Sequence, residues 1–341
     1  MIDYLRKLCE LDGTSGREEN VRDFIISQIN GKCDWRVDPM GNVIAFKKGK
    51  ASPKNKVMLT AHMDEVALIV TEINSDGSLG FGCVGGIDSK VLCGRTVRFS
   101  QNAVPVKGVI GLKPVHLCEG DESAKAPPAN KLTIDIGADG REEAEKYISL
   151  GDCAYFDSPF IEFGKGMVYS KAIDDRFGCA ALIKMINSTL EYDLHFAFLV
   201  QEEIGLRGAG AAAFSIRPDY AIVLEATTAS DVAGVKGADK VCSLGGGAVV
   251  SFKDRTTAYD MRLFKNAFEV AERRGIKIQQ KTRTTGGNDA GEIHKAVGGV
   301  RTLTVSLPCR YIHSATSVAC VDDLESCFDL AVALAEEYCN A

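Results

Sequence analysis

Apolar residues recur at helical intervals near the start of the chain. Over residues 2–30 they fall three or four positions apart, as on the buried face of an amphipathic helix. The turn Thr14-Ser15-Gly16 divides this segment, and Ser15 is a suitable N-cap because its hydroxyl can accept a free backbone N–H. We therefore expect two helices separated by a turn.

The pattern changes from about residue 67 to residue 162, where short apolar runs alternate with glycine or aspartate turns. We expect strands at 67–73, 96–99, 106–110 and 132–136. Only residues 141–149 have a helical pattern in this stretch. These features favour a small, separate β-rich domain.

Longer helical patterns alternate with apolar strands after residue 167. The segments are 179–187, 195–200, 221–225, 258–273, 300–306 and 322–337. Together with two earlier strand predictions, 43–47 and 57–60, this alternation is typical of an α/β layer with a mixed or mostly parallel sheet. We expect one discontinuous domain, residues 1–66 and 163–341, interrupted by the insertion 67–162.

Composition excludes several classes of protein. A length of 341 residues suggests two domains or one domain with an insertion. The net charge of −6 has no block of one sign, which argues against nucleic acid as the main ligand. No apolar run approaches the roughly 20 residues of a membrane span, and the first residues lack a signal-peptide pattern.

Cysteine usage points to a reducing compartment. The twelve cysteines are scattered and form no C-x-x-C pair, so neither a disulfide framework nor a thiolate metal site is indicated. We expect reduced thiols that pack as small apolar side chains, and a cytoplasmic location.

Acidic and imidazole side chains follow several of the apolar runs. Five of them lie at strand ends or turns and offer metal ligands: His62, Asp174, Glu203, Glu225 and His313. Neutral imidazole with carboxylate is the ligand set expected for zinc, cobalt or manganese. Two histidines and three carboxylates suffice for two divalent ions when one carboxylate bridges them.

Two further residues suit the chemistry of such a site. Asp64, two positions after His62, can orient the imidazole from behind. Two bound cations would lower the pKa of a water molecule between them, and Glu202, next to Glu203, can act as the general base that takes its proton.

Each residue taken alone also has an ordinary structural explanation. A single histidine such as His62 is more often a hydrogen-bonded structural residue, and Asp174-Asp175 could cap the following helix. Glu225 could pair with a buried arginine, and Glu202-Glu203 could be a solvated strand end. Their occurrence at successive strand ends, where α/β sheets bind ligands, favours a dinuclear hydrolase.

The same residues lie in segments that resemble the M42 family of metallo-aminopeptidases. The segments are LTAHMDEVALIV (59–70), SKAIDDRFGC (170–179), VQEEIGLRGA (200–209), IVLEATTASD (222–231), TTGGNDAGEIH (284–294) and RYIHS (310–314). They follow the family's order, and the insertion lies where that family has its oligomerisation domain.

This resemblance implies a fold and a set of roles. The fold would be α/β, a zinc-peptidase-like three-layer core with a mixed sheet and a small inserted β-barrel-like domain. His62, Asp174 and Glu225 would hold one metal, and Asp174, Glu203 and His313 the other, with Asp174 as the bridge. Glu202 would be the general base and Asp64 the partner of His62.

The resemblance also implies an activity and an assembly. We expect an aminopeptidase that removes N-terminal residues from peptides with a free N-terminus, through a metal-bridged hydroxide. Zinc or cobalt would be the two ions, with manganese as an alternative. Dimers would build a homo-oligomer of the tetrahedral dodecamer type. The alternatives are a related dinuclear-metal deacylase or amidohydrolase, and a non-catalytic assembly scaffold.

The chain differs from the family pattern at two places. Many members have Asp where this chain has Glu225, and the segment FKDRTTAY (252–259) departs from an Arg-Gly-Pro type of loop. This loop would shape the substrate site, so the preferred N-terminal residue stays open. Of the remaining histidines, His195 and His294 are interpreted as structural. His116 lies in a loop-like setting, and a role at a subunit boundary is an alternative to a purely structural one.

Overall fold

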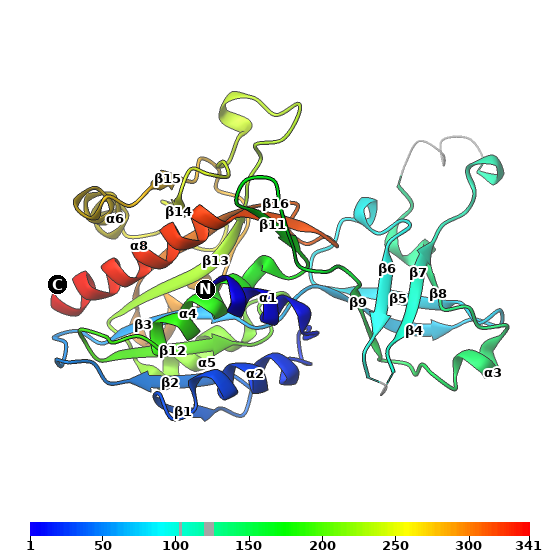
Figure 1. The fold of residues 1–341 in the computed structure, drawn as a ribbon, viewed down its shortest axis with the longest axis horizontal. Helices are drawn as coiled ribbons and strands as arrows, with labels where there is room; N and C mark the ends of the chain where they lie inside the picture. Colours follow the sequence, from blue (N-terminus) through cyan, green and yellow to red (C-terminus); the bar gives the residue numbers. More distant parts are fainter. Residues whose placement is uncertain (102–103, 119–125) are drawn as a thin grey trace.

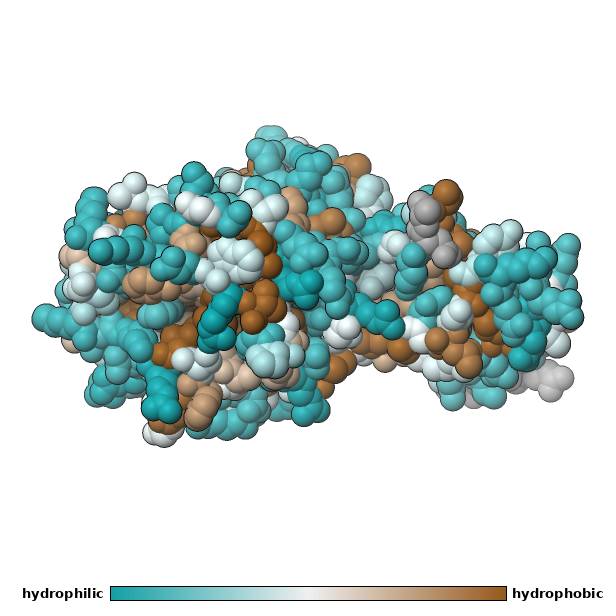
Figure 2. Space-filling model, turned by 90° about the horizontal axis from the view of Figure 1, so that it is seen from below, coloured by the Kyte–Doolittle hydropathy of each residue, from teal (hydrophilic) through white to brown (hydrophobic). Residues whose placement is uncertain are grey.

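The protein has a larger sheet-and-helix part and a smaller barrel part. The structure is a computed structural model that describes residues 1–101, 104–118 and 126–341. In Figure 1 the barrel lies to one side of the main sheet. The view from below in Figure 2 shows the same elongated outline, with the smaller part projecting from the larger.

The main sheet has eleven strands among the described residues. Nine of them follow in the order β1 (Asp34–Val37), β2 (Val43–Lys47), β12 (Leu194–Leu199), β3 (Val57–His62), β13 (Tyr220–Thr228), β16 (Arg301–Arg310), β17 (Ser317–Cys320), β11 (Met167–Ser170) and β10 (Ile161–Phe163). The strand β14 (Ala248–Val250) pairs with β16 and with β15 (Ile278–Gln280).

The centre of this sheet is parallel and deeply buried. The pairs β12–β3, β3–β13 and β13–β16 are parallel, whereas the pairs along the path outside them are antiparallel. Every residue of β3 is buried, which explains why this strand has a continuous apolar run rather than an alternating pattern. Because parallel strands end at the same edge, the residues after them come together.

Helices pack against this sheet in layers. They are α1 (Ile2–Glu10), α2 (Glu19–Ile29), α4 (Ile173–Ile186), α5 (Arg207–Ile216), α6 (Met261–Arg274), α7 (Ala290–Ile293) and α8 (Val321–Asn340). The helices α4 and α8 contact the central strands, α1 and α2 pack on α4, and α6 packs on α8. A second pair, α5 and α7, is in mutual contact, and α5 contacts β12 while α7 contacts β13 and β16. The predicted α/β core is therefore confirmed.

The insertion forms a closed barrel. Its strands run in the order β4 (Ala67–Ile73), β5 (Leu79–Val84), β8 (Thr133–Asp135), β7 (Val106–Gly111), β6 (Thr96–Phe99) and β9 (Cys153–Phe156). They enclose an apolar cluster of their own, separate from the main core. The predicted β-barrel-like domain is confirmed.

Three local predictions from the sequence are wrong. Ser15 does not cap α2, which begins at Glu19, because its hydroxyl instead donates to Asp64 Oδ2 at 2.6 Å. The helix predicted over 141–149 is only α3 (Arg141–Ala144). Glu225 lies inside β13, three residues before its last residue, rather than at a strand end.

A buried network of charges joins the barrel to the main part. The Lys171 ammonium lies 2.7 Å from Glu65 Oε1 and 3.2 Å from Asp12 Oδ1. The Arg176 guanidinium lies 3.1 Å from Glu65 Oε1, and Arg98, on β6, lies 2.6 Å from Asp12 Oδ1. Since Lys171 and Arg176 flank Asp174 in the chain, the network anchors a segment that carries a predicted ligand.

The cysteines and the helices bear on two further expectations, reduced thiols and the lack of a membrane span. All twelve cysteines lie within the described residues and are unpaired. Across the same residues, no helix is both long enough and apolar enough to cross a membrane.

Replacing Glu65 with glutamine should destabilise the protein, because Lys171 and Arg176 would retain buried charges without their shared anion. We expect a loss of about 3–5 kcal/mol in the free energy of unfolding, measured by urea denaturation. As a control, Glu191→Gln removes a surface partner of Lys50 and should cost less than about 1 kcal/mol. Equal unfolding midpoints for the Glu65→Gln variant and the control would contradict this account.

Candidate metal centre

Five predicted ligands converge at the carboxyl edge of the parallel strands. His62 is the last residue of β3, and Glu225 lies on the neighbouring strand β13. Asp174 lies at the start of α4, where its φ and ψ angles are not helical. Glu203 follows β12 in the chain, and His313 follows β16.

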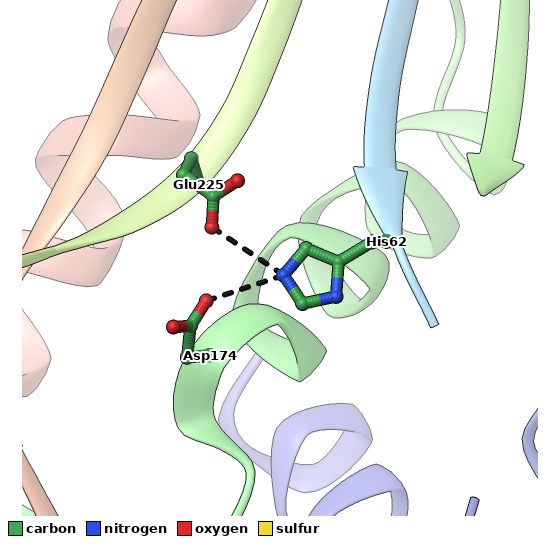
Figure 3. A group of neighbouring side chains, drawn as sticks. All are labelled: His62, Asp174 and Glu225. Carbon is green, nitrogen blue, oxygen red and sulfur yellow. Dashed lines mark hydrogen bonds and ion pairs between the residues drawn. The ribbon is translucent and has the colours of Figure 1, made fainter. Parts of the chain in front are cut away.

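Asp174 lies between the two imidazoles. Its Oδ1 is 3.3 Å from His62 Nε2, and its Oδ2 is 3.3 Å from His313 Nε2. Glu225 Oε1 is 3.5 Å from His62 Nε2, and Glu203 Oε2 is 3.3 Å from His313 Nε2. In Figure 3, the carboxylates of Asp174 and Glu225 both point toward His62.

These separations suit a metal ion. Four ligand atoms at about 2.1 Å from a tetrahedral zinc lie about 3.4 Å from one another. The ligand atoms form two sets with Asp174 in common, His62–Asp174–Glu225 and Asp174–Glu203–His313, and within each set they lie within 4.8 Å of one another. A third such set among the described residues is His62–Glu202–Glu203.

Burial makes this collection of carboxylates costly without cations. Burial raises the pKa of Glu203 to about 8, and that of Glu225 well above its usual range. Although burial alone would lower the pKa of His313, the neighbouring Asp174 and Glu203 raise it to about 9. Glu225 Oε2 is buried and has no hydrogen-bond partner among the described residues. The donor set and this free oxygen therefore fit divalent cations.

Asp64 supports both the imidazole and the loop that carries the two glutamates. The Nδ1 atom of His62 lies 3.1 Å from the carbonyl oxygen of Asp64 and 3.5 Å from its carboxylate. The carboxylate of Asp64 accepts the backbone N–H groups of Glu202 at 3.0 Å and Glu203 at 3.1 Å. Ser15 donates to the same carboxylate. The position of the Glu202–Glu203 turn thus depends on Asp64.

Glu202 has the freest carboxylate of the group. No described residue hydrogen-bonds its side-chain oxygens, and burial raises its pKa well above the usual range. It lines a cavity of about 630 Å³ together with Asp174, Glu203, Glu225 and His313. Its carboxylate is therefore available to a molecule in the cavity.

The structure brings further residues to this cavity that the sequence analysis did not single out. Arg255 and Lys281 line it from two loops. Asn288, in the TTGGNDAGEIH segment, also lines the cavity. The next residue, Asp289, does not line it; Asp289 is 1% exposed, and its Oδ1 atom has no partner among the described residues. Burial raises the pKa of Asp289 to about 7. The glycine-rich segment around Asp289 was the sequence signal that could have pointed to this residue. Single cations in loops, such as Arg255 and Lys281, give no sequence signal.

The other histidines lie away from the metal centre. The ring of His195 packs against Phe46, with centroids 5.0 Å apart, and burial lowers its pKa to about 4. His294 Nδ1 lies 2.7 Å from the carbonyl oxygen of Ala290. His116 lies in an exposed short turn of the barrel part.

Comparison with known proteins gives one consistent family. A sequence profile described as M42 glutamyl aminopeptidase matches residues 41–330. A putative aminopeptidase from Acetivibrio thermocellus is 39% identical over 97% of both chains. A lysyl aminopeptidase from Pyrococcus furiosus is 33% identical over 99% of this chain and 98% of its own. A glutamyl aminopeptidase from Lactococcus lactis is 30% identical over 95% of this chain and 92% of its own.

Solved structures agree with these relatives. An aminopeptidase from Desulfurococcus kamchatkensis has a TM-score of 0.93 and 35% identity, covering 98% of this chain and 94% of its own. The TET1 peptidase of Pyrococcus horikoshii has a TM-score of 0.86 and 36% identity, covering 98% of both chains. The profile match, the whole-length relatives and the shared fold together show that this chain belongs to the M42 family of aminopeptidases.

Proposed function

We propose that the protein is a dinuclear-metal aminopeptidase that removes N-terminal residues from peptides with a free amino group. The observation that carries the proposal is the position of Asp174, whose two oxygens each lie 3.3 Å from a different imidazole. A carboxylate held in this way is suited to bridge two ions. The family membership supplies the reaction class, the cleavage of a peptide bond next to the N-terminal residue.

Each ion has a proposed set of ligands. His62, Asp174 and Glu225 would hold one ion, and Asp174, Glu203 and His313 the other. Imidazole with carboxylate favours zinc or cobalt, with manganese as the alternative. When bound, the ions supply Lewis acidity and lower the pKa of water.

Glu202 is the proposed general base. Its carboxylate lines the cavity, has no hydrogen-bond partner among the described residues, and has a pKa that burial raises. A base with a raised pKa can take a proton from the attacking water and return it to the leaving amine near neutral pH. Asp64 keeps Glu202 in place through the 3.0 Å bond from the Glu202 backbone N–H, and its carbonyl oxygen orients His62.

We also propose that the two parts of the chain have different roles. Residues 1–66 and 163–341 would form the catalytic domain, and residues 67–162 an oligomerisation domain. Exposed apolar side chains on the barrel part support an assembly role: Val109, Leu112, Leu117, Tyr147 and Leu150. The Pyrococcus horikoshii relative assembles into a tetrahedron or an octahedral shell, which favours dimers that build a dodecamer here. The unpaired cysteines favour a cytoplasmic location.

The proposed reaction predicts a specific substrate dependence. After metal removal and reloading with zinc, cobalt or manganese, we expect p-nitroaniline release from free aminoacyl-p-nitroanilides, measured by absorbance. N-acetylated analogues should not react, because the site is proposed to bind a free amino group. Release from acetylated substrates alone would favour the deacylase alternative. No release with any metal would favour the assembly scaffold.

Glu202→Gln should lower kcat by about 10²–10⁴-fold, because the amide cannot accept the proton of the attacking water. Metal content should stay at the wild-type value, since Glu202 is not a proposed ligand. The control is Glu269→Gln, which changes an exposed glutamate on α6. The proposed role of Glu202 is wrong if this variant keeps full turnover.

Single ligand variants should separate the two ions. His313→Ala should remove about one ion per chain, because His313 belongs to one ligand set, whereas Asp174→Asn should weaken both sets. The measurement is elemental analysis after dialysis against a weak chelator, with the Glu269→Gln variant as the control. Retention of two ions by Asp174→Asn would contradict the bridging role.

A further inference from the structure

The segment after β5 brings the backbone of the barrel next to the ligand set Asp174–Glu203–His313. The backbone of Gly85 lies so close to Glu203 that a Cβ atom added to Gly85 would be 3.3 Å from Glu203 Oε2. The same oxygen lies 3.3 Å from His313 Nε2. The added Cβ would also be 2.7 Å from Val66 Cγ1, a separation that real side chains do not adopt. The position beside this ligand oxygen therefore requires a residue without a side chain.

The next residue, Gly86, holds the imidazole of the same ligand set. The Nδ1 atom of His313 lies 3.0 Å from the carbonyl oxygen of Gly86. Because a carbonyl oxygen can only accept a hydrogen bond, Nδ1–H is the donor, and Nε2 of the neutral ring is left unprotonated. Nε2 is the atom that faces Asp174 and Glu203, each at 3.3 Å. The bond to the barrel backbone thus leaves the ring in the tautomer that a metal ion requires.

The loop that carries His313 also packs into the barrel. Ala315, two residues later in the chain, is 6% exposed and belongs to the apolar cluster of the barrel. Val66 belongs to the same cluster, and Ile87 packs against it. His313 itself has a φ of +58°, which a residue with a side chain keeps only where its surroundings hold it. The contacts of Gly86 and Ala315 provide such surroundings.

The other ligand set is supported from within the main part. The Nδ1 atom of His62 lies 3.1 Å from the carbonyl oxygen of Asp64. Glu225 lies on the central strand β13, and its Oε1 accepts the backbone N–H of Ala226 at 3.0 Å. The two imidazoles are therefore oriented in the same way, by a carbonyl oxygen at Nδ1, but from different parts of the protein.

We propose that Gly85 and Gly86 of the inserted barrel position the ligands of one of the two ions, so that this ion is bound at the boundary between the two parts of the protein. The inference rests on the proposed dinuclear function and extends it, because the insertion then completes the metal centre in addition to its role in assembly. The lining of the 630 Å³ cavity supports this, since it includes Gly86, Asp88 and Val91 from the insertion.

Gly85→Ala tests the inference. The added methyl group would meet Val66 and Glu203, and alanine is strained at the φ of +84° that Gly85 has. We expect one ion to leave at a chelator concentration about 10- to 100-fold lower than for wild type, as is typical when the support of a ligand is lost. The measurement is zinc per chain, by elemental analysis of the zinc-loaded protein after dialysis against graded chelator concentrations.

Two other glycines of the insertion provide matched controls. Gly94→Ala introduces similar backbone strain, at a φ of +73°, but its Cβ would point into open space. Gly86→Ala keeps the carbonyl group, and its Cβ would lie at an ordinary contact distance of 3.7 Å from His313 Nδ1. Both variants should keep two ions at the wild-type chelator concentration. Equal losses in Gly94→Ala and Gly85→Ala would overturn the proposal, because general strain in the barrel would then explain them.

Combined variants identify the ion that Gly85 supports. His313→Ala should already lack the ion of this set, so adding Gly85→Ala should lower the zinc content no further. Glu225→Gln weakens the other set, so adding Gly85→Ala to it should remove the remaining ion as well. A further loss in the first combination and none in the second would assign Gly85 to the other ion and contradict the proposal.

A second variant decides if Gly85→Ala does not fold. Ala315→Gly removes the methyl group that packs the His313 loop into the barrel, and it should weaken the same ion by a smaller factor. Retention of both ions by this variant at the wild-type chelator concentration would then overturn the proposal.

Zinc content separates this inference from the proposed function. A wild-type chain that holds two ions but releases no p-nitroaniline would contradict the aminopeptidase proposal, while the zinc content of Gly85→Ala would still test the role of the barrel. Active wild type together with two firmly held ions in Gly85→Ala would overturn this inference alone. Fewer than two ions in zinc-loaded wild type would contradict both.

Discussion

The structure depends on the close approach of buried carboxylates around two imidazoles. Asp174, Glu203 and Glu225 lie within 3.5 Å of an imidazole Nε2 atom at an edge where burial raises the pKa of both glutamates. Within each ligand set the carboxylate oxygens also lie within 4.8 Å of one another. Like charges this close repel, and a low-dielectric surrounding strengthens the repulsion. Divalent cations would remove that cost, which is why we propose this edge of the sheet as a binding site for them.

Holding these groups together requires rigid support, and the chain provides it from residues next to the ligands. Asp64 fixes the backbone of the Glu202–Glu203 turn. Glu65 binds Lys171 and Arg176, on either side of Asp174 in the chain. The same network reaches Arg98 on the barrel through Asp12, so a continuous chain of ion pairs links the inserted part to the segment that carries Asp174. Such support keeps ligands in a fixed geometry before an ion binds.

Much of the fold and the candidate ligands could be predicted from the sequence, because their signals are local. His62 and Glu203 follow apolar runs that form central strands, and the order of patterns indicated an α/β core with a β insertion. Ser15 was misassigned because its partner, Asp64, is distant in the chain. Strands of three residues, such as β14 and β15, are too short to show the alternation of apolar and polar positions from which a strand is predicted. Lys281 and Arg255 could not be found, since only tertiary packing brings two loop cations to one cavity.

The two proposed ions and their bridging carboxylate can be observed directly. Anomalous diffraction from crystals of the zinc-loaded protein, collected at the zinc absorption edge, locates such ions without reference to activity. We expect two peaks per chain, roughly 3.5–4 Å apart, with one oxygen of Asp174 bound to each. A single peak, or two ions that do not share Asp174, would contradict the account.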